Sequence, residues 1–197
     1  MSKLLTLKHW QLFLLIIGLP ILLEIAVVGV IMTTQQPSNL LFVLPIIIVL
    51  VTCIFFGWFY ILGTSLYKKL PSEESMNIGF FKFCIYFPVA YIVLISAYIV
   101  ALTTGYSVGN NSNPGLVLLI LPIHLFSMFC IFYCLYFIAK ALKTVEIQRT
   151  VSFSDFAGEF FMIWFFPIGV WIIQPRVNKL FGVIDNDPYD GILDHNI

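Results

Sequence analysis

The segment from Trp10 to Met32, WQLFLLIIGLPILLEIAVVGVIM, decides the fold class, because its 23 residues contain a single charged side chain, Glu24. A helix of about 20 apolar residues is long enough to cross the hydrocarbon core of a bilayer. A cleaved signal peptide has a shorter apolar core of roughly 7–15 residues, and the residues after Ile31 offer no small-x-small cleavage pattern. The segment therefore predicts a retained membrane-spanning helix.

Three further apolar runs predict three more spanning helices, at residues 40–66, 83–102 and 116–139. The composition agrees with this prediction, since 60% of the residues are hydrophobic and only 10% are charged. The mean hydropathy of +1.00 lies far outside the range of soluble domains. The sequence thus predicts an all-α integral membrane protein in which residues 1–197 form a single domain built on a four-helix transmembrane bundle.

The basic residues predict the orientation of this bundle. All ten lysine and arginine residues fall on one side of the four-span topology, whereas the connections at 33–39 and 103–115 on the other side carry no charge. Short cytoplasmic loops are enriched in lysine and arginine. We therefore expect both termini to lie in the cytoplasm.

A shorter apolar run, FFMIWFFPIGVWII, follows at residues 160–173. Its 14 residues are fewer than a spanning helix needs, and Pro167 and Gly169 interrupt it. We expect a re-entrant or interfacial helix; the alternative is a fifth crossing, which would move Arg176 and Lys179 to the outer side. The acidic, turn-rich residues 183–197 predict a mobile tail.

Two ionisable residues lie inside the predicted spans, Glu24 in the first and His124 in the fourth. A carboxylate inside a bilayer is costly unless it is neutralised or paired, so it is a functional candidate by default. Each residue lies eight positions from the outer end of its predicted span. This spacing places both about 12 Å below the outer boundary. We therefore hypothesise that Glu24 and His124 form a hydrogen bond or ion pair.

An alternative for Glu24 is a neutral carboxyl group that bonds a helix carbonyl, such as that of Ile16, which Pro20 leaves without its usual donor. In the fourth helix, Ser127 follows His124 by three residues and belongs to the same mildly polar face. We expect this face to point into the bundle.

Signatures of catalysis are absent from the sequence: it contains no H-E-x-x-H, no G-x-S-x-G and no phosphate-binding glycine loop. The four cysteines lie inside predicted spans without a zinc-binding spacing, so we expect free thiols, no metal and no cofactor. The basic residues are sparse and interspersed with acids, which indicates contact with lipid headgroups in preference to nucleic acid. The sequence therefore predicts a protein that is not an enzyme and whose first partner is the lipid bilayer.

Two stretches near the ends of the chain carry a resemblance. The first is Lys8-His9-Trp10-Gln11, and the second is a closing block that runs from Gly158 to Asn178 and contains FPIGVW at 166–171 and QPRVN at 174–178. These stretches resemble a group of small, uncharacterised bacterial multi-pass membrane proteins. The resemblance implies a bacterial inner-membrane protein and transfers no activity. The candidate residues of the closing block are Glu159, Pro167, Gly169, Trp171, Gln174, Pro175, Arg176 and Asn178.

Two functions remain open from the sequence. One is an accessory or interaction component whose cytoplasmic loops and tail engage a protein partner. The other is a small oligomeric channel or transporter that uses Glu24 and His124. A partner-binding protein should tolerate Glu24→Gln, whereas a conducting protein should not.

Overall fold

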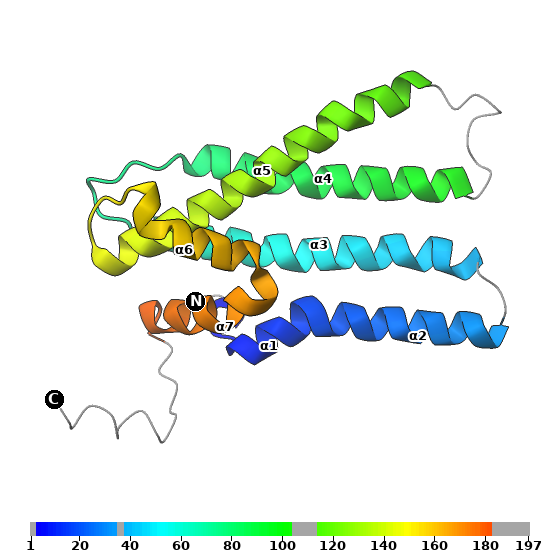
Figure 1. The fold of residues 1–197 in the computed structure, drawn as a ribbon, viewed down its shortest axis with the longest axis horizontal. Helices are drawn as coiled ribbons and strands as arrows, with labels where there is room; N and C mark the ends of the chain where they lie inside the picture. Colours follow the sequence, from blue (N-terminus) through cyan, green and yellow to red (C-terminus); the bar gives the residue numbers. More distant parts are fainter. Residues whose placement is uncertain (1–2, 35–37, 104–113, 183–197) are drawn as a thin grey trace.

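A computed structural model describes residues 3–34, 38–103 and 114–182, and the predicted acidic tail at 183–197 lies outside these ranges (Figure 1). In the described residues all regular elements are helical. In chain order they are the 3-10 turn η1 (Lys3–Leu5), α1 (His9–Phe13), the π-helical turn η2 (Leu14–Gly18), α2 (Leu19–Thr34), α3 (Ser38–Tyr67), α4 (Ile78–Thr103), α5 (Pro114–Ile147), α6 (Phe153–Trp164) and α7 (Phe166–Leu180).

Among the described residues, four helices are long and apolar enough to cross a membrane, which confirms the predicted four-helix membrane bundle. The candidate spans are His9–Thr33, Val43–Tyr67, Ile78–Ala101 and Leu118–Ile147. Two bounds differ from the prediction by five residues or more: α4 begins at Ile78, before residue 83, and α5 continues beyond Ala139 to Ile147. The apolar runs underestimate these helices because hydropathy marks the buried length of a helix, and lysine is a good helix former that does not end it.

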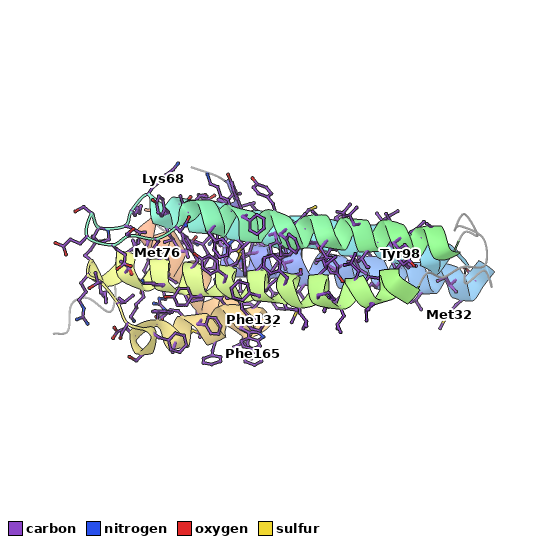
Figure 2. The ribbon with its side chains drawn as sticks, turned by 90° about the horizontal axis from the view of Figure 1, so that it is seen from above. Met32, Lys68, Met76, Tyr98, Phe132 and Phe165 are labelled. Carbon is purple, nitrogen blue, oxygen red and sulfur yellow. The ribbon has the colours of Figure 1, made fainter. Side chains whose placement is uncertain are left out.

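The spans run alternately in opposite directions (Figure 1). α2 packs on α3, α3 packs on α4 and α5, and α4 packs on α5. α3 and α4 approach closely at Gly63, where an added Cβ would lie 2.3 Å from Cζ of Phe81. We call the end of the bundle that carries Lys68, Lys82 and Lys140 the basic end, and the other half of the spans the far half. Figure 2 places Lys68 and Met76 at the basic end, and Met32 towards the other.

Side-chain packing is densest near the basic end. The large side chains of Trp58, Phe59, Phe81 and Phe137 are fully buried there. In the span that contains α2, by contrast, only 6% of the most apolar window is buried, against 39% in α3. The far half of α5 leans away from α4 in Figure 1, and a cavity of about 430 Å³ opens between these helices. The far half is therefore thinly packed by the chain itself.

The first span is continuous but contains one wider turn at Leu14–Gly18. The backbone N–H of Leu19 donates to the carbonyl oxygen of Leu14, which is five residues earlier. Pro20 follows directly and has no N–H to donate to Ile16. A π-helical turn is one way in which a helix accommodates such a break in its hydrogen bonds. The proline therefore accounts for the local widening of the span.

Residues 160–173 form parts of two helices in place of the single helix that we predicted. α6 ends at Trp164, Phe165 adopts a non-helical conformation with φ −85° and ψ 57°, and α7 begins at Phe166. The chain reverses here, so α6 and α7 form a helical hairpin along the basic half of the bundle (Figure 1). Proline and glycine close behind the break explain why one helix cannot continue through it.

The tip of this hairpin lies beside the interior part of the spans. The ring of Phe166 contacts those of Phe55 and Trp58 at centroid distances of 5.4 Å each, and Trp164 contacts Phe132 at 4.7 Å. Phe55 precedes the end of α3 at Tyr67 by about 18 Å of helix. The hairpin therefore extends alongside the bundle and returns to the basic end (Figure 1).

Candidate functional site

The two stretches that carry the resemblance meet at the basic end. Gln174 of α7 donates from Nε2 to the carbonyl oxygen of Leu7 at 3.0 Å, to that of Leu5 at 3.4 Å and to Oδ1 of Asn178 at 3.2 Å. Asn178 donates from Nδ2 to the same oxygen of Leu7 at 3.2 Å. Both amides are buried, and we call the pair the amide clamp. Because a buried carbonyl needs a donor, the clamp stabilises the otherwise irregular chain before α1.

An aromatic contact extends the amide clamp. The ring of Trp171 lies 4.7 Å from that of His9 and 5.8 Å from that of Phe13. Gln11 accepts a hydrogen bond at Oε1 from the backbone N–H of Lys8, at 3.0 Å, which satisfies one donor at the start of α1. In the opening stretch, Lys8 and Gln11 therefore help to begin α1, and His9 contacts α7 through Trp171.

Four charged side chains form a second cluster, on the side of α7 that faces α5 and α6. Arg176 donates to Oε1 of Glu159 and, from Nε, to Oε1 of Glu146, each at 2.7 Å. Lys143 lies 3.2 Å from the same oxygen of Glu159. We call Lys143, Glu146, Glu159 and Arg176 the charge cluster. Only 7% of the Glu159 side chain is exposed, so its two cationic partners offset the loss of hydration.

The charge cluster shifts the pKa values of Glu159 and Arg176. Burial by itself would raise the pKa of Glu159, but hydrogen bonds from Arg176 and Lys143 outweigh it and hold the pKa below its ordinary value. Hydrogen bonds to Glu146 and Glu159 raise the pKa of Arg176 further above its already high value. Glu159 is therefore ionised near neutral pH, which suits a structural ion pair better than a proton-transfer group.

The other candidates of the closing block shape the hairpin. A Cβ added to Gly169 would lie 1.7 Å from the carbonyl oxygen of Met162, so only glycine permits this approach of α7 to α6. Pro167 occupies the first turn of α7, where a missing N–H is harmless. Pro175 lies inside α7 and removes one helical hydrogen bond. These three residues set the path of the backbone that carries Gln174 and Arg176.

A further ion pair ties the loop between α3 and α4 to α5. Lys140 lies 2.7 Å from Glu74, whose side chain is only 7% exposed.

At the start of α6, the carboxylate of Asp155 accepts a hydrogen bond from the backbone N–H of Ser152 at 2.9 Å. This bond lowers the pKa of Asp155. The spacing of these two residues is that of a capping box at the start of a helix.

The intramembrane candidates do not form the predicted arrangement within one copy. Nδ1 of His124 lies 3.2 Å from the hydroxyl of Tyr91, and its partner is therefore α4. Glu24 lies on the exposed surface of α2, which packs on α3. Ser127 is buried, as predicted for a bundle-facing residue, but His124 is exposed, because the two side chains are about 60° apart around the helix. The expectation that they share one inward face is therefore incorrect.

Sequence reasoning missed part of this site. Lys143 and Glu146 were not among the predicted site residues, although their three-residue spacing places both on one side of a helix. The carbonyl groups of Leu5 and Leu7 carried no signal at all, since every residue has one. The closing block, in contrast, contains both residues of the amide clamp and two members of the charge cluster.

The described residues contain no group of three or more His, Cys, Asp or Glu side chains that could hold a metal ion. The four cysteines are free thiols, as expected. The cavity between α4 and α5 is lined by apolar side chains together with Tyr91 and Tyr98.

No protein-family model, curated protein or solved structure matches this chain. The four apolar helices of the described residues indicate a multi-pass membrane protein. Its amide clamp and charge cluster lie together at the basic end.

Proposed function

We propose that this chain is a non-catalytic accessory component of an assembly in the bacterial inner membrane, with its basic end in the cytoplasm. One observation carries this proposal: α2 is scarcely packed by its own chain, yet it presents the carboxylate of Glu24 on an exposed face inside a span. A carboxylate that faces lipid is unfavourable. A membrane-embedded partner that covers α2 would remove that penalty.

The basic end supports the same proposal. Six of its charged side chains pair with one another, four in the charge cluster and two in the contact of Lys140 with Glu74. Buried carboxylates that are already paired in this way stabilise a junction; they are not poised to transfer protons. We infer that this end is a rigid platform from which the loops and the tail at 183–197 engage a partner in the cytoplasm.

Transport through a single copy is less well supported. A pathway residue should line a polar passage inside the bundle, but Glu24 lies on the outside of α2 and the cavity between α4 and α5 is lined mainly by apolar side chains. The function as an accessory component therefore ranks above a channel or transporter.

Photocrosslinking in native membranes tests the proposal. A photoreactive residue is placed at Ile25 on the Glu24 face of α2 or, as a matched control, at Leu94 on α4; the two side chains are 63% and 70% exposed. We expect a protein adduct at Ile25 and only lipid adducts at Leu94. Lipid adducts alone at both positions would contradict an embedded partner on α2.

Ion and proton flux in liposomes distinguishes the transport alternative. We expect no flux through purified wild-type protein. Flux that disappears in Glu24→Gln would replace the accessory function with transport. Deletion of residues 183–197 tests the cytoplasmic contact, because it should release a soluble partner and leave the adduct at Ile25 unchanged.

A further inference from the structure

Two exposed stripes in the far half of the bundle have the same pattern. On α2 the stripe consists of Ile21, Glu24, Ile25 and Val28, and on α5 it consists of Leu121, His124, Leu125 and Met128. In each stripe an ionisable residue and three apolar residues recur at positions i, i+3, i+4 and i+7, which align on one face of a helix. We call them the α2 stripe and the α5 stripe. In the described part of the far half, Glu24 and His124 are the only acidic and basic side chains.

Glu24 and His124 lie at similar levels in the bundle. Glu24 precedes the far end of α2 at Thr34 by about 15 Å of helix. His124 contacts Tyr91, which precedes the far end of α4 at Thr103 by about 18 Å. A carboxylate and an imidazole at these levels could meet if their helices were adjacent.

The two stripes do not meet within one copy, because α2 packs on α3 and α5 packs on α4 and α3. Figure 1 shows α2 and α5 at opposite edges of the bundle. The described hydrogen bond of His124 engages Nδ1. Its Nε2 is therefore left for a group that approaches from outside α5.

We propose that the partner on α2 is a second copy of this chain, whose α5 stripe packs on the α2 stripe with the Glu24 carboxylate bound to Nε2 of His124. This inference rests on the proposed function and specifies its embedded partner. Contact of α2 with α2 would bring two carboxylates together, and contact of α5 with α5 would bring two imidazoles together. Only the contact of α2 with α5 satisfies both groups at once.

The arrangement also defines the kind of oligomer. The two stripes lie on different helices, so the contact is head-to-tail, and each copy can bind one neighbour through α2 and another through α5. Copies that share one orientation in the membrane place these helices antiparallel, because α2 runs away from the basic end and α5 runs towards it. Ile21 then lies beside Met128, and Val28 lies beside Leu121.

Cysteine crosslinking in membranes tests this register. Two differently tagged full-length chains carry Cys53→Ala, because Cys53 is exposed, and keep the buried cysteines. One chain has Ile21→Cys or Val28→Cys, and the other has Leu121→Cys or Met128→Cys. A short bis-maleimide should join the matched pairs 21 with 128 and 28 with 121 about tenfold better than the mismatched pairs 21 with 121 and 28 with 128, whose residues lie roughly 9–12 Å apart along the helix axis.

Exchange of the two ionisable residues tests the pairing itself. Glu24→His alone and His124→Glu alone should each reduce the matched crosslink about tenfold, as expected for the loss of one interhelical polar contact. The double variant, with both exchanges, should restore it, since it recreates the pair with the roles reversed. An unchanged crosslink in the single variants would overturn the pairing.

The outcomes also separate this inference from the proposed function. Equal crosslinking of matched and mismatched pairs, or none between copies, overturns the head-to-tail contact. If photoadducts at Ile25 then identify a different protein, the accessory function stands without the homo-oligomer. If Ile25 gives lipid adducts only, both proposals fail.

Discussion

Removal of Arg176 tests the role of the charge cluster most directly. The substitution Arg176→Met keeps most of the apolar stem and removes the cation that Glu146 and Glu159 share. The side chains of these two glutamates are only 20% and 7% exposed. Loss of one partner costs about 3–5 kcal/mol in a fully buried ion pair and at most about 1 kcal/mol in an exposed one. Arg176 itself is 27% exposed, and Lys143 still contacts Glu159. We therefore expect a loss of about 2–3 kcal/mol in the free energy of unfolding.

The buried cysteines provide the assay. Cys84, Cys130 and Cys134 have no exposed surface and become reactive only when the bundle opens. Thermal unfolding is followed with a thiol-reactive dye in a fixed detergent, in a Cys53→Ala background, because Cys53 is exposed. For a chain of this length, the expected loss lowers Tm by about 4–12 °C.

Two further variants separate the ion pairs from general effects of charge. Lys179→Met removes an exposed cation from the same helix and should change the free energy of unfolding by less than about 0.5 kcal/mol. Arg176→Met combined with Glu159→Met should be less destabilised than the sum of the single variants, because it removes the unpaired carboxylate as well. The reasoning would be refuted if Arg176→Met shifted Tm no more than Lys179→Met.

Three other predictions concern the hairpin, the amide clamp and the charge cluster. Gly169→Ala should destabilise by about 3 kcal/mol or more, because its Cβ would overlap the backbone of Met162, whereas the exposed Gly158→Ala in α6 should be neutral or slightly stabilising; dye-monitored unfolding measures both. Gln174→Leu should destabilise by about 1–3 kcal/mol, since the carbonyl of Leu5 loses its bond from Gln174 and that of Leu7 keeps only the bond from Asn178, and it should expose the chain before α1 to limited proteolysis in the folded protein. The pKa of Glu159 is lowered from its ordinary value of 4.5. The stabilising contribution of Glu159 is therefore complete above pH 4.5 and disappears as the pH falls through the lower pKa of the folded protein. Over that range of pH, Tm should drop in the wild type and drop less in Glu159→Gln.

The architecture could be predicted because membrane spans leave a one-dimensional signal. The absence of water in a bilayer requires long apolar helices, and any stretch such as residues 40–66 satisfies that requirement by itself. The break at Phe165 was only partly predictable. Pro167 and Gly169 indicated an interruption, but that the chain reverses there depends on the fit of Gly169 against Met162. A contact of that kind belongs to the folded chain and not to a local pattern.

The polar contacts were harder to predict because their partners are distant in sequence. Gln174 donates to the carbonyl oxygens of Leu7 and Leu5, which precede it by 167 and 169 positions in the sequence. No side-chain type marks a residue whose carbonyl will be an acceptor. The pairing of Glu24 with His124 was inferred from equal depth alone. Depth does not specify which helices are neighbours, and in this bundle α2 and α5 lie apart.

The amide clamp and the charge cluster constrain the order in which the chain assembles. The amide clamp joins the chain before α1 to α7, and the charge cluster joins α5 and α6 to the same helix. Neither can form until all four spans have been inserted and the hairpin has entered beside them, because α7 is the last described helix of the chain. Until then Glu159 lacks Arg176, and the carbonyl of Leu7 lacks both amide donors. The densely packed basic half is therefore completed last, and an incomplete chain exposes unpaired polar groups at the basic end, where the ends of all four spans converge.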